Sequence, residues 1–261
     1  MKKYVMRFAT AFLMVMSIIG TSWKAIDRQQ TQHDVIKNIS ADSLYSQLVS
    51  SIYHEIHLDA VGLTQQVFEK ALTGFYNMKY SGLVNTKSIL TIADFDQEST
   101  RKRLYIINLA DRKLILNTWV AHGQNSGGDK PSSFSNKINS NQSSLGFYLT
   151  GEIYYGKHGR SLKLDGMDQD FNNNARERSI VVHGASYVSQ KSIDELGRLG
   201  RSQGCPAVPA KLADDIINTI SDHTVLYIHN SNQLYYSSFL NETLAASVAL
   251  NQPQVFASKT D

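Results

Sequence analysis

The chain contains a single cysteine, Cys205, so it cannot form an internal disulfide. Its first residues nevertheless suggest export, because a basic start is followed by an apolar run over residues 8–20. Small exported domains often depend on disulfides for stability. We therefore expect this chain of 261 residues to be stabilised by a sizeable hydrophobic core. The lone thiol is then either kept for chemistry or a small buried apolar residue.

The apolar run holds thirteen residues, which suits a signal peptide and is too short to span a bilayer comfortably. Small residues at 20–22 offer a cleavage position, so we predict a signal peptide over residues 1–22, with an uncleaved membrane anchor as the alternative. The expected location is the periplasm or the cell wall, with membrane contact only through this segment if it stays uncleaved.

The net charge gives no argument for a nucleic-acid partner. The whole chain carries 26 basic and 23 acidic residues, but its first 22 residues hold three basic residues and no acidic one. Removal of the signal leaves 23 of each, so the mature chain is formally neutral.

Apolar spacing predicts two covering helices, over residues 42–53 and 63–76, within an N-terminal helical segment of 40–80. A polar tether over 23–39 precedes them. Alternating or β-branched segments then predict strands over residues 88–95, 104–109, 113–121, 145–155, 179–182 and 224–229. The class is therefore mainly β with flanking helices (α+β). Residues 122–144 form a long polar loop that could act as a lid, and 231–261 are predicted to be a C-terminal appendage.

Cys205 lies in the stretch Ser202-Gln203-Gly204-Cys205-Pro206, on a turn before a helix predicted over 209–221. Pro209 suits the first helical position, where no N–H is needed. A thiol near the positive end of a helix favours the thiolate. We therefore predict that Cys205 is a nucleophile.

His183 ends a predicted strand and is followed by Gly184, so its ring can reach a cleft and act as general base. Gly204 and Cys205 offer adjacent backbone N–H groups to an oxyanion, and Ser202 is placed to orient the turn or the histidine. Arg178, Arg198 and Arg201 flank these segments, and Arg201 is the best candidate for binding a substrate carboxylate.

Three His-Gly pairs, at His122, His158 and His183, also suggest a His/Cys zinc site with Cys205. Their spacings of 36, 25 and 22 residues match no compact ligand motif, so we predict no metal. His122 and His158 are instead expected to line the cleft, as substrate-binding candidates, or to satisfy loop backbone. A metal hydrolase remains an alternative.

His183-Gly184, seventeen further residues and Ser202-Gln203-Gly204-Cys205 resemble the signature of the L,D-transpeptidase (YkuD-type) family, HG followed by S-[HR]-G-C. The chain looks most like the murein L,D-transpeptidase catalytic domain subgroup. The sequence segments that carry this likeness are residues 89–95, 121–123, 161–166, 180–185 and 204–207. The resemblance covers roughly residues 60–230 and implies a YkuD-like β-sandwich catalytic domain over 81–230.

The resemblance implies that Cys205 attacks a peptidoglycan stem peptide before its terminal D-alanine and forms a thioester. An amine of a second stem then resolves the thioester into a 3-3 cross-link, and no cofactor is required. In this scheme His183 matches the base, Gly184 the residue that orients it, and Ser202 and Gly204 the positions that flank the nucleophile.

Two residues depart from the family pattern. Gln203 stands where His or Arg is common, and Ala207 stands where Arg or Asn is common. Both changes remove polar groups that would help to hold substrate. Arg201 is expected to replace the lost carboxylate contact, and Gln203 itself is a further substrate-binding candidate. Three activities stay open: transpeptidase, L,D-carboxypeptidase or amidase acting through the same acyl-enzyme, and an inactive peptidoglycan-binding module.

Overall fold

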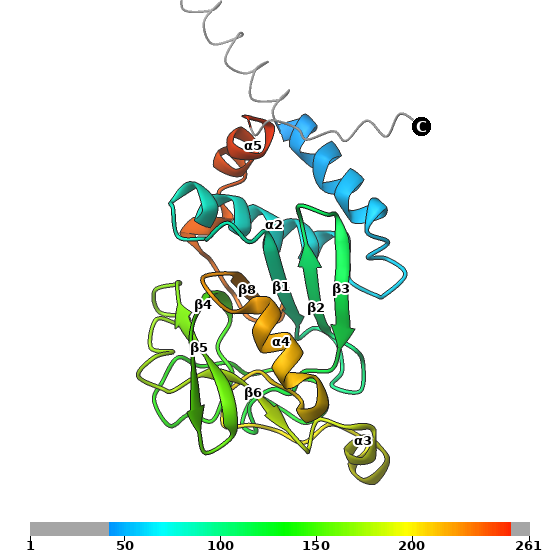
Figure 1. Ribbon diagram of the computed structural model, residues 1–261, viewed down its shortest axis with the longest axis vertical. Coiled ribbons are helices and arrows are strands. Elements are labelled where there is room, and N and C mark those ends of the chain that lie inside the picture. Colours follow the sequence, from blue (N-terminus) through cyan, green and yellow to red (C-terminus); the bar gives the residue numbers. More distant parts are fainter. Residues whose placement is uncertain (1–41, 252–261) are drawn as a thin grey trace, which may run out of the picture.

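The computed structural model describes residues 42–251 of the chain (Figure 1). The predicted signal peptide over 1–22 and the tether over 23–39 lie outside the described residues, as do residues 252–261. Among the helices between residues 42 and 251, none combines the length and the apolar character that a membrane crossing requires.

One eight-stranded sheet forms the body of the molecule, in the order β3-β2-β1-β8-β4-β5-β6-β7. The pairs β1–β8 and β6–β7 are parallel and the other pairs are antiparallel. The strands are β1 (Ile89–Asp94), β2 (Leu104–Asn108), β3 (Lys113–Thr118), β4 (Gly146–Gly156), β5 (Gly159–Gly166), β6 (Val181–Ala185), β7 (Ala207–Pro209) and β8 (Val225–His229).

The sheet curls until its two edges nearly meet. Ala121, just after β3, bridges to Ala207 of β7, and Gly123 bridges to Ser202 just before β7. The result is a nearly closed barrel or sandwich with flanking helices, which confirms the predicted fold class. It also places the chain after β3 directly against the segment that carries Cys205.

Both faces of the central strands are buried, because successive side chains of a strand point to opposite sides. In β1, Leu90 and Ile92 join the core under α2 (Gln65–Tyr80), whereas Ile89 and Ala93 join the core around α4 (Ala213–Ile220). Figure 1 shows α2 and α4 on the two sides of these strands. The sizeable hydrophobic core expected for a chain without a disulfide is therefore present, as one layer on each side of these strands.

The predicted N-terminal helices are confirmed. The first runs to residue 55 within the described chain, and α2 continues four residues beyond the predicted end. Thr64 caps α2 by accepting a hydrogen bond from the N–H of Val67. Side chains of both helices belong to the same core as β1, β2 and β8, so this segment packs on the sheet.

The predicted strands are confirmed, although the one predicted over 179–182 lies further along the chain, as β6. Five elements were not predicted: β5, the three-residue β7, α3 (Gln190–Leu196), η2 (Ser238–Leu240) and α5 (Glu242–Asn251). The helix expected over 209–221 is a short 3-10 turn, η1 (Ala210–Leu212), followed by α4.

The expectation of a loose C-terminal appendage is wrong for residues 231–251. Asn77 of α2 donates hydrogen bonds to the carbonyls of Phe239 and Asn241, at 2.6 and 2.9 Å. Phe239 belongs to the 3-10 turn η2 (Ser238–Leu240), and α5 then packs on α2. The Tyr235 hydroxyl donates to Asp168 at 2.6 Å. This arm is therefore part of the fold that covers the sheet.

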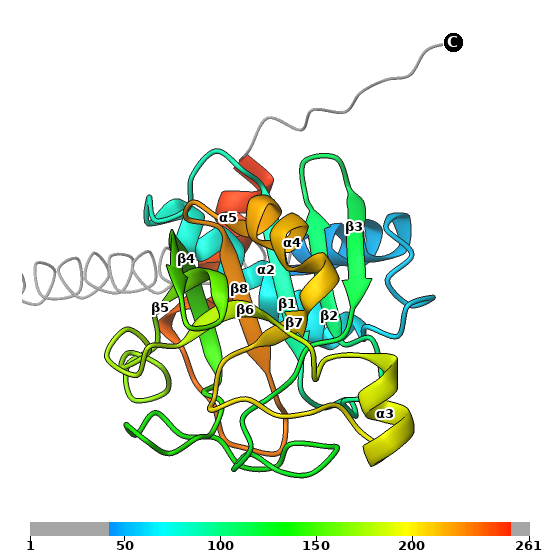
Figure 2. The ribbon, with the colours of Figure 1, turned by 60° about the horizontal axis from the view of Figure 1, so that its bottom comes forward.

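The 122–144 segment lies at the same end of the sheet as the chain that joins β6 to β7 (Figure 2). Its polar side chains hold it in place rather than leaving it open. Ser126 and Ser143 are buried, and the Ser126 hydroxyl accepts from the N–H of Ser143 at 2.9 Å. Ser143 in turn donates to the carbonyl of Gly204 at 3.3 Å. The long segment therefore supports the turn that carries the cysteine.

Candidate active site

Residues 202–206 form a tight turn, the nucleophile turn, which Ser202 closes internally. The Ser202 hydroxyl donates to the carbonyl of Cys205 at 2.6 Å and accepts from the N–H of Gly204 at 3.0 Å. Gly204 has a φ of +121°, and a Cβ there would lie 2.7 Å from the carbonyl oxygen of Gln142. Only glycine fits this position, so local backbone geometry presents Cys205.

His183 lies in β6, directly opposite Ala207 of β7, so the parallel pairing of these strands brings the histidine beside the nucleophile turn. Its Nδ1 is 3.0 Å from the carbonyl oxygen of Gly184. A carbonyl only accepts, so Nδ1 carries the ring proton and Nε2 keeps its lone pair. A Cβ on Gly184 would lie 2.8 Å from Cβ of Ala213. Residue 184 is therefore a glycine because α4 packs too closely against β6 to leave room for a side chain.

A cavity of about 370 Å³ opens over these residues. It brings together six of the predicted site residues: Cys205, His183, Ser202, Gln203, Arg201 and His158. Its other lining residues include side chains that the sequence did not single out, namely Gln124, Tyr154, Lys157 and Tyr187. Lys157 and His158 stand between Gly156 and Gly159, a hairpin-turn pattern that signals the tip joining β4 to β5.

The His158 ring lies flat against the His183 ring, with centroids 4.2 Å apart and planes 20° apart. Burial lowers the pKa of His183; the Gly184 carbonyl opposes this shift, and the charges of His158 and Lys157 add to it. The pKa of His158, although its side chain is largely exposed, is lowered as well, by partial shielding from water and by the charge of Lys157. His183 is therefore held neutral, as a proton acceptor, at ordinary pH.

The thiol of Cys205 is protonated at rest. Burial raises its pKa, while the backbone of Val181 and the charges of Arg178 and Lys157 work in the opposite direction. The thiol donates a hydrogen bond to the carbonyl oxygen of Ser179, which lies 3.7 Å from Sγ. The predicted help from a helix N-terminus is wrong, because β7 and η1 separate Cys205 from α4.

Gly204 does not offer the oxyanion donor that was predicted, because its N–H is already bonded to Ser202. The backbone N–H of Cys205 itself has no hydrogen-bond acceptor among the described residues. That N–H is the member of the predicted pair that remains free to meet a tetrahedral oxyanion.

His122 does not line this cavity, contrary to expectation. Its side chain is buried, and its Nδ1 accepts from the guanidinium of Arg103 at 2.7 Å. Burial, together with Arg103, lowers the pKa of His122 to about 3. Its backbone carbonyl nevertheless accepts from the N–H of Ser202 at 2.9 Å, so the residue supports the nucleophile turn from behind.

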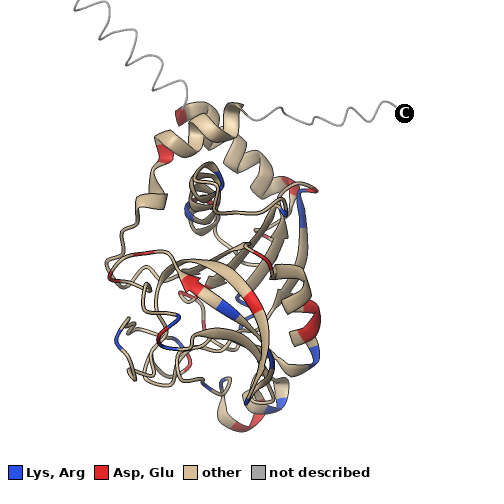
Figure 3. Ribbon diagram, turned by 60° about the vertical axis from the view of Figure 1, so that its left-hand side comes forward, with Lys and Arg blue, Asp and Glu red and all other residues tan. Residues whose placement is uncertain are grey.

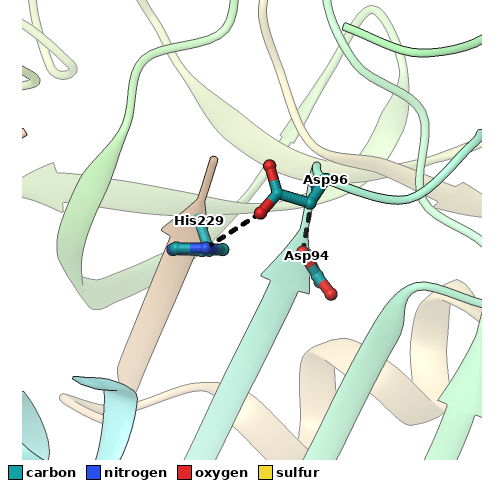
Figure 4. Close-up of side chains that lie close together, drawn as sticks. All are labelled: Asp94, Asp96 and His229. Carbon is teal, nitrogen blue, oxygen red and sulfur yellow. Dashed lines mark hydrogen bonds and ion pairs between the residues drawn. The ribbon is translucent and has the colours of Figure 1, made fainter. Parts of the chain in front are cut away.

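The described residues contain one group suited to hold a metal, Asp94, Asp96 and His229 (Figure 4). It contains none of the histidines considered for a zinc site with Cys205. Its polar atoms already bind one another: His229 Nε2 is 3.2 Å from Asp96, and Asp94 accepts from the backbone N–H of Asp96 at 3.1 Å. His229 Nδ1 is 3.2 Å from the Tyr227 hydroxyl. This network ties the end of β1 to the end of β8.

Basic and acidic residues are interspersed over the side of the molecule that carries β4 and β5 (Figure 3). Arg176, for example, forms ion pairs with both Glu152 and Asp165. The Cys205 cavity differs, because its lining includes Lys157, Arg178 and Arg201 and no carboxylate. The cavity therefore favours a substrate that carries negative charge.

The sequence model of the family described as L,D-transpeptidase catalytic domain matches residues 59–229. No curated protein matches the chain.

Among solved structures, an L,D-transpeptidase from Mycobacterium smegmatis is 11% identical with a TM-score of 0.36, and the match covers 55% of this chain and 59% of that one. The helical cell shape determining protein Pgp2 from Campylobacter jejuni is 14% identical with a TM-score of 0.36, over 69% and 63% of the two chains. An L,D-transpeptidase from Xylanimonas cellulosilytica is 11% identical with a TM-score of 0.32, over 64% and 81%. The chain thus spans 59% of the first of these relatives.

Proposed function

The chain belongs to the L,D-transpeptidase catalytic domain family, and from this we propose that it is an exported cysteine transpeptidase acting on peptidoglycan stem peptides. The observation that carries the proposal is the shared cavity of Cys205 and His183. The thiol holds a proton there, and the histidine presents a basic Nε2 because its Nδ1 faces the Gly184 carbonyl.

In the first half-reaction, Nε2 of His183 takes the thiol proton as Sγ of Cys205 attacks the carbonyl carbon of the amide before the terminal D-alanine. The carbonyl oxygen becomes an oxyanion, which the N–H of Cys205 meets. The tetrahedral intermediate collapses when the C–N bond breaks, and the imidazolium returns its proton to the leaving amine. A thioester on Cys205 and free D-alanine result.

In the second half-reaction, an amine of a neighbouring stem peptide attacks the thioester and gives a proton to His183. The C–S bond breaks, the thiol recovers its proton, and a 3-3 cross-link is formed. If water attacks in place of the amine, the same acyl-enzyme yields a shortened stem and the protein is an L,D-carboxypeptidase.

Charge in the cavity supports a stem peptide as substrate. Stem peptides carry several free carboxylates, and the cavity lining offers Lys157, Arg178 and Arg201 without a competing acid. One guanidinium nitrogen of Arg201 donates to the carbonyls of Gln124 and Gly127, at 2.9 and 2.8 Å, which fixes this side chain in the cavity wall. Gln203, which also lines the cavity, is exposed.

The location belongs to the same proposal. Peptidoglycan lies outside the cytoplasmic membrane, so the activity requires export, and residues 1–22 supply a signal of suitable composition. We place the protein in the periplasm or the cell wall, with the membrane touched only if that segment stays uncleaved.

Product analysis tests the function. The purified protein is incubated with tetrapeptide-bearing muropeptides, and the products are separated by mass. Cross-linked dimers that are absent with Cys205→Ala support the transpeptidase. Trimmed monomers alone show that water is the acceptor, and binding without turnover that is unchanged in Cys205→Ala shows an inactive wall-binding module. Activity that disappears with a chelator and returns with zinc would identify a metal hydrolase instead.

A further inference from the structure

Arg178 makes four hydrogen bonds to the distal half of the 122–144 segment. Its guanidinium donates to the carbonyl of Ser135 at 2.7 Å, to the hydroxyl of Ser140 at 3.2 Å, to the carbonyl of Gln142 at 2.5 Å and to the hydroxyl of Ser144. All four acceptors are neutral oxygens. One side chain thus holds several turns of an otherwise irregular segment.

The same guanidinium lies against the nucleophile turn. A Cβ on Gly204 would be 3.1 Å from an Arg178 nitrogen and 2.7 Å from the carbonyl of Gln142, so both groups fill the space where a side chain would stand. Arg178 also lines the cavity that contains Cys205 and His183. Its position is therefore fixed both by the segment beneath and by the glycine beside the cysteine.

Among residues 42–251, no carboxylate forms an ion pair with Arg178. This differs from Arg160 and Arg176, which lie on acidic partners. A half-buried cation without a counter-ion favours any negative charge that forms next to it. In this cavity, that charge forms on Sγ of Cys205 when the thiol loses its proton.

We propose that Arg178 is a positioning residue for the nucleophile, which clamps residues 135–144 against Gly204 and holds its positive charge beside the Cys205 thiolate. The proposal rests on the proposed function for its effect on turnover, whereas its effect on the thiol stands independently.

Two consequences follow from this placement. Loss of the charge makes the thiolate harder to form, and loss of the clamp frees the 135–144 segment and the backbone of Gly204. The charges of Arg178 and Lys157 both act to lower the pKa of the Cys205 thiol. The Cys205 thiolate in turn acts to raise the pKa of Arg178. The other titratable groups that line the cavity are Tyr154, His158, His183, Tyr187 and Arg201.

The test measures the pH dependence of Cys205 alkylation by iodoacetamide in the whole protein, followed by intact mass. Only the thiolate reacts, so the rate reports the charge at Sγ. Arg178→Gln is expected to move the profile to higher pH and to slow alkylation at pH 8 by about fivefold, the effect of one nearby charge at a partly exposed site. Arg178→Lys keeps the charge and is expected to stay near the wild-type profile.

Two further variants separate the roles of charge and clamp. Ser144→Ala removes one clamp contact and leaves the charge, so alkylation is expected to be unchanged while turnover falls. Arg198→Gln is the matched control, because Arg198 does not line the cavity and donates to the nearby carbonyl of Leu199 at 2.7 Å. Circular dichroism and the melting temperature of each variant establish that it is folded.

Overlapping alkylation profiles for Arg178→Gln and the wild type overturn the proposal, as does an Arg178→Lys profile displaced as far as that of Arg178→Gln. A displaced profile in a protein that makes no acyl adduct leaves the role of Arg178 intact and removes the proposed function. An unchanged profile in a protein that does form the acyl adduct overturns the role of Arg178 and leaves the proposed function intact.

Discussion

The imidazole of His158 is stacked on the imidazole of His183, with 4.2 Å between the ring centroids. His158 comes from the tip of the β4–β5 hairpin and is exposed, whereas His183 lies in β6 and is buried. The outer ring both covers the inner one and repels its protonated form. A hairpin distant in sequence thus helps to keep the general base neutral.

We predict that His158→Ala moves the acid limb of the pH–rate profile to higher pH. The base works when it is neutral, and in the wild type its pKa lies below the usual value of 6.5, so activity is lost only as the pH falls through that lowered value. Removal of His158 takes away both cover and repulsion, so the pKa of His183 rises. Profiles of kcat/KM measure the effect. Tyr155→Phe, on the same hairpin but outside the cavity lining, is the control, and coincident profiles for His158→Ala and the wild type would contradict the prediction.

Ser202→Ala is expected to lower kcat/KM by about 10- to 100-fold, because a displaced nucleophile loses its attack geometry. The change removes the 2.6 and 3.0 Å hydrogen bonds that close the nucleophile turn. The cost in free energy of unfolding is about 1–2 kcal/mol. Ser189→Ala is the comparison, since it removes a hydroxyl that caps α3 away from the cavity. Equal activity of the two variants would show that the turn needs no internal support.

Arg201→Ala is expected to raise the KM for a stem peptide about tenfold and to leave kcat nearly unchanged. A charge-assisted hydrogen bond to a carboxylate contributes on the order of 1.5 kcal/mol, which corresponds to one decade in binding. Steady-state kinetics against Arg198→Ala provide the measurement. Unchanged stem-peptide binding in Arg201→Ala would remove this residue from the substrate site.

Much of this architecture could be predicted from local sequence patterns. The strands around β1 and β8 read as apolar segments, and Cys205 and His183 are recognisable because each stands in a short motif next to glycine. By contrast, α5 has no apolar stripe, since its buried residues are the alanines 245, 246 and 249, and the three residues of β7 are too few to show alternation.

The roles of His122 and Arg178 depend on long-range packing. His122-Gly123 looks like His183-Gly184 in the sequence, yet Arg103 captures its ring in the core. The Arg178 guanidinium is positioned beside the nucleophile turn only when residues 135–144 fold and their carbonyls accept its hydrogen bonds. The sequence predicts a free N–H at Gly204 because it does not reveal that the Ser202 hydroxyl accepts a hydrogen bond from this group.

The C-terminal arm offers a test of stability that is separate from chemistry. Asp168 is buried and accepts hydrogen bonds from the Tyr235 hydroxyl, the Ser237 hydroxyl and the N–H of Phe147. Asp168→Ala leaves these donors without their acceptor and is expected to lower the free energy of unfolding by roughly 3 kcal/mol. Urea titration measures the loss, with Gln169→Ala as the exposed neighbour for comparison. A loss no larger than that of Gln169→Ala would mean that the attachment of the arm does not depend on Asp168.

The central claim is that Cys205 forms a covalent acyl-enzyme, and intact mass spectrometry tests it most directly. The protein, with Cys205 confirmed as reduced, is mixed with a tetrapeptide muropeptide and quenched in acid. We predict a mass increase equal to the muropeptide less D-alanine, mapped to Cys205, cleaved by hydroxylamine and absent in Cys205→Ala. No adduct and no altered muropeptide, or an adduct that persists in Cys205→Ala, would contradict the account.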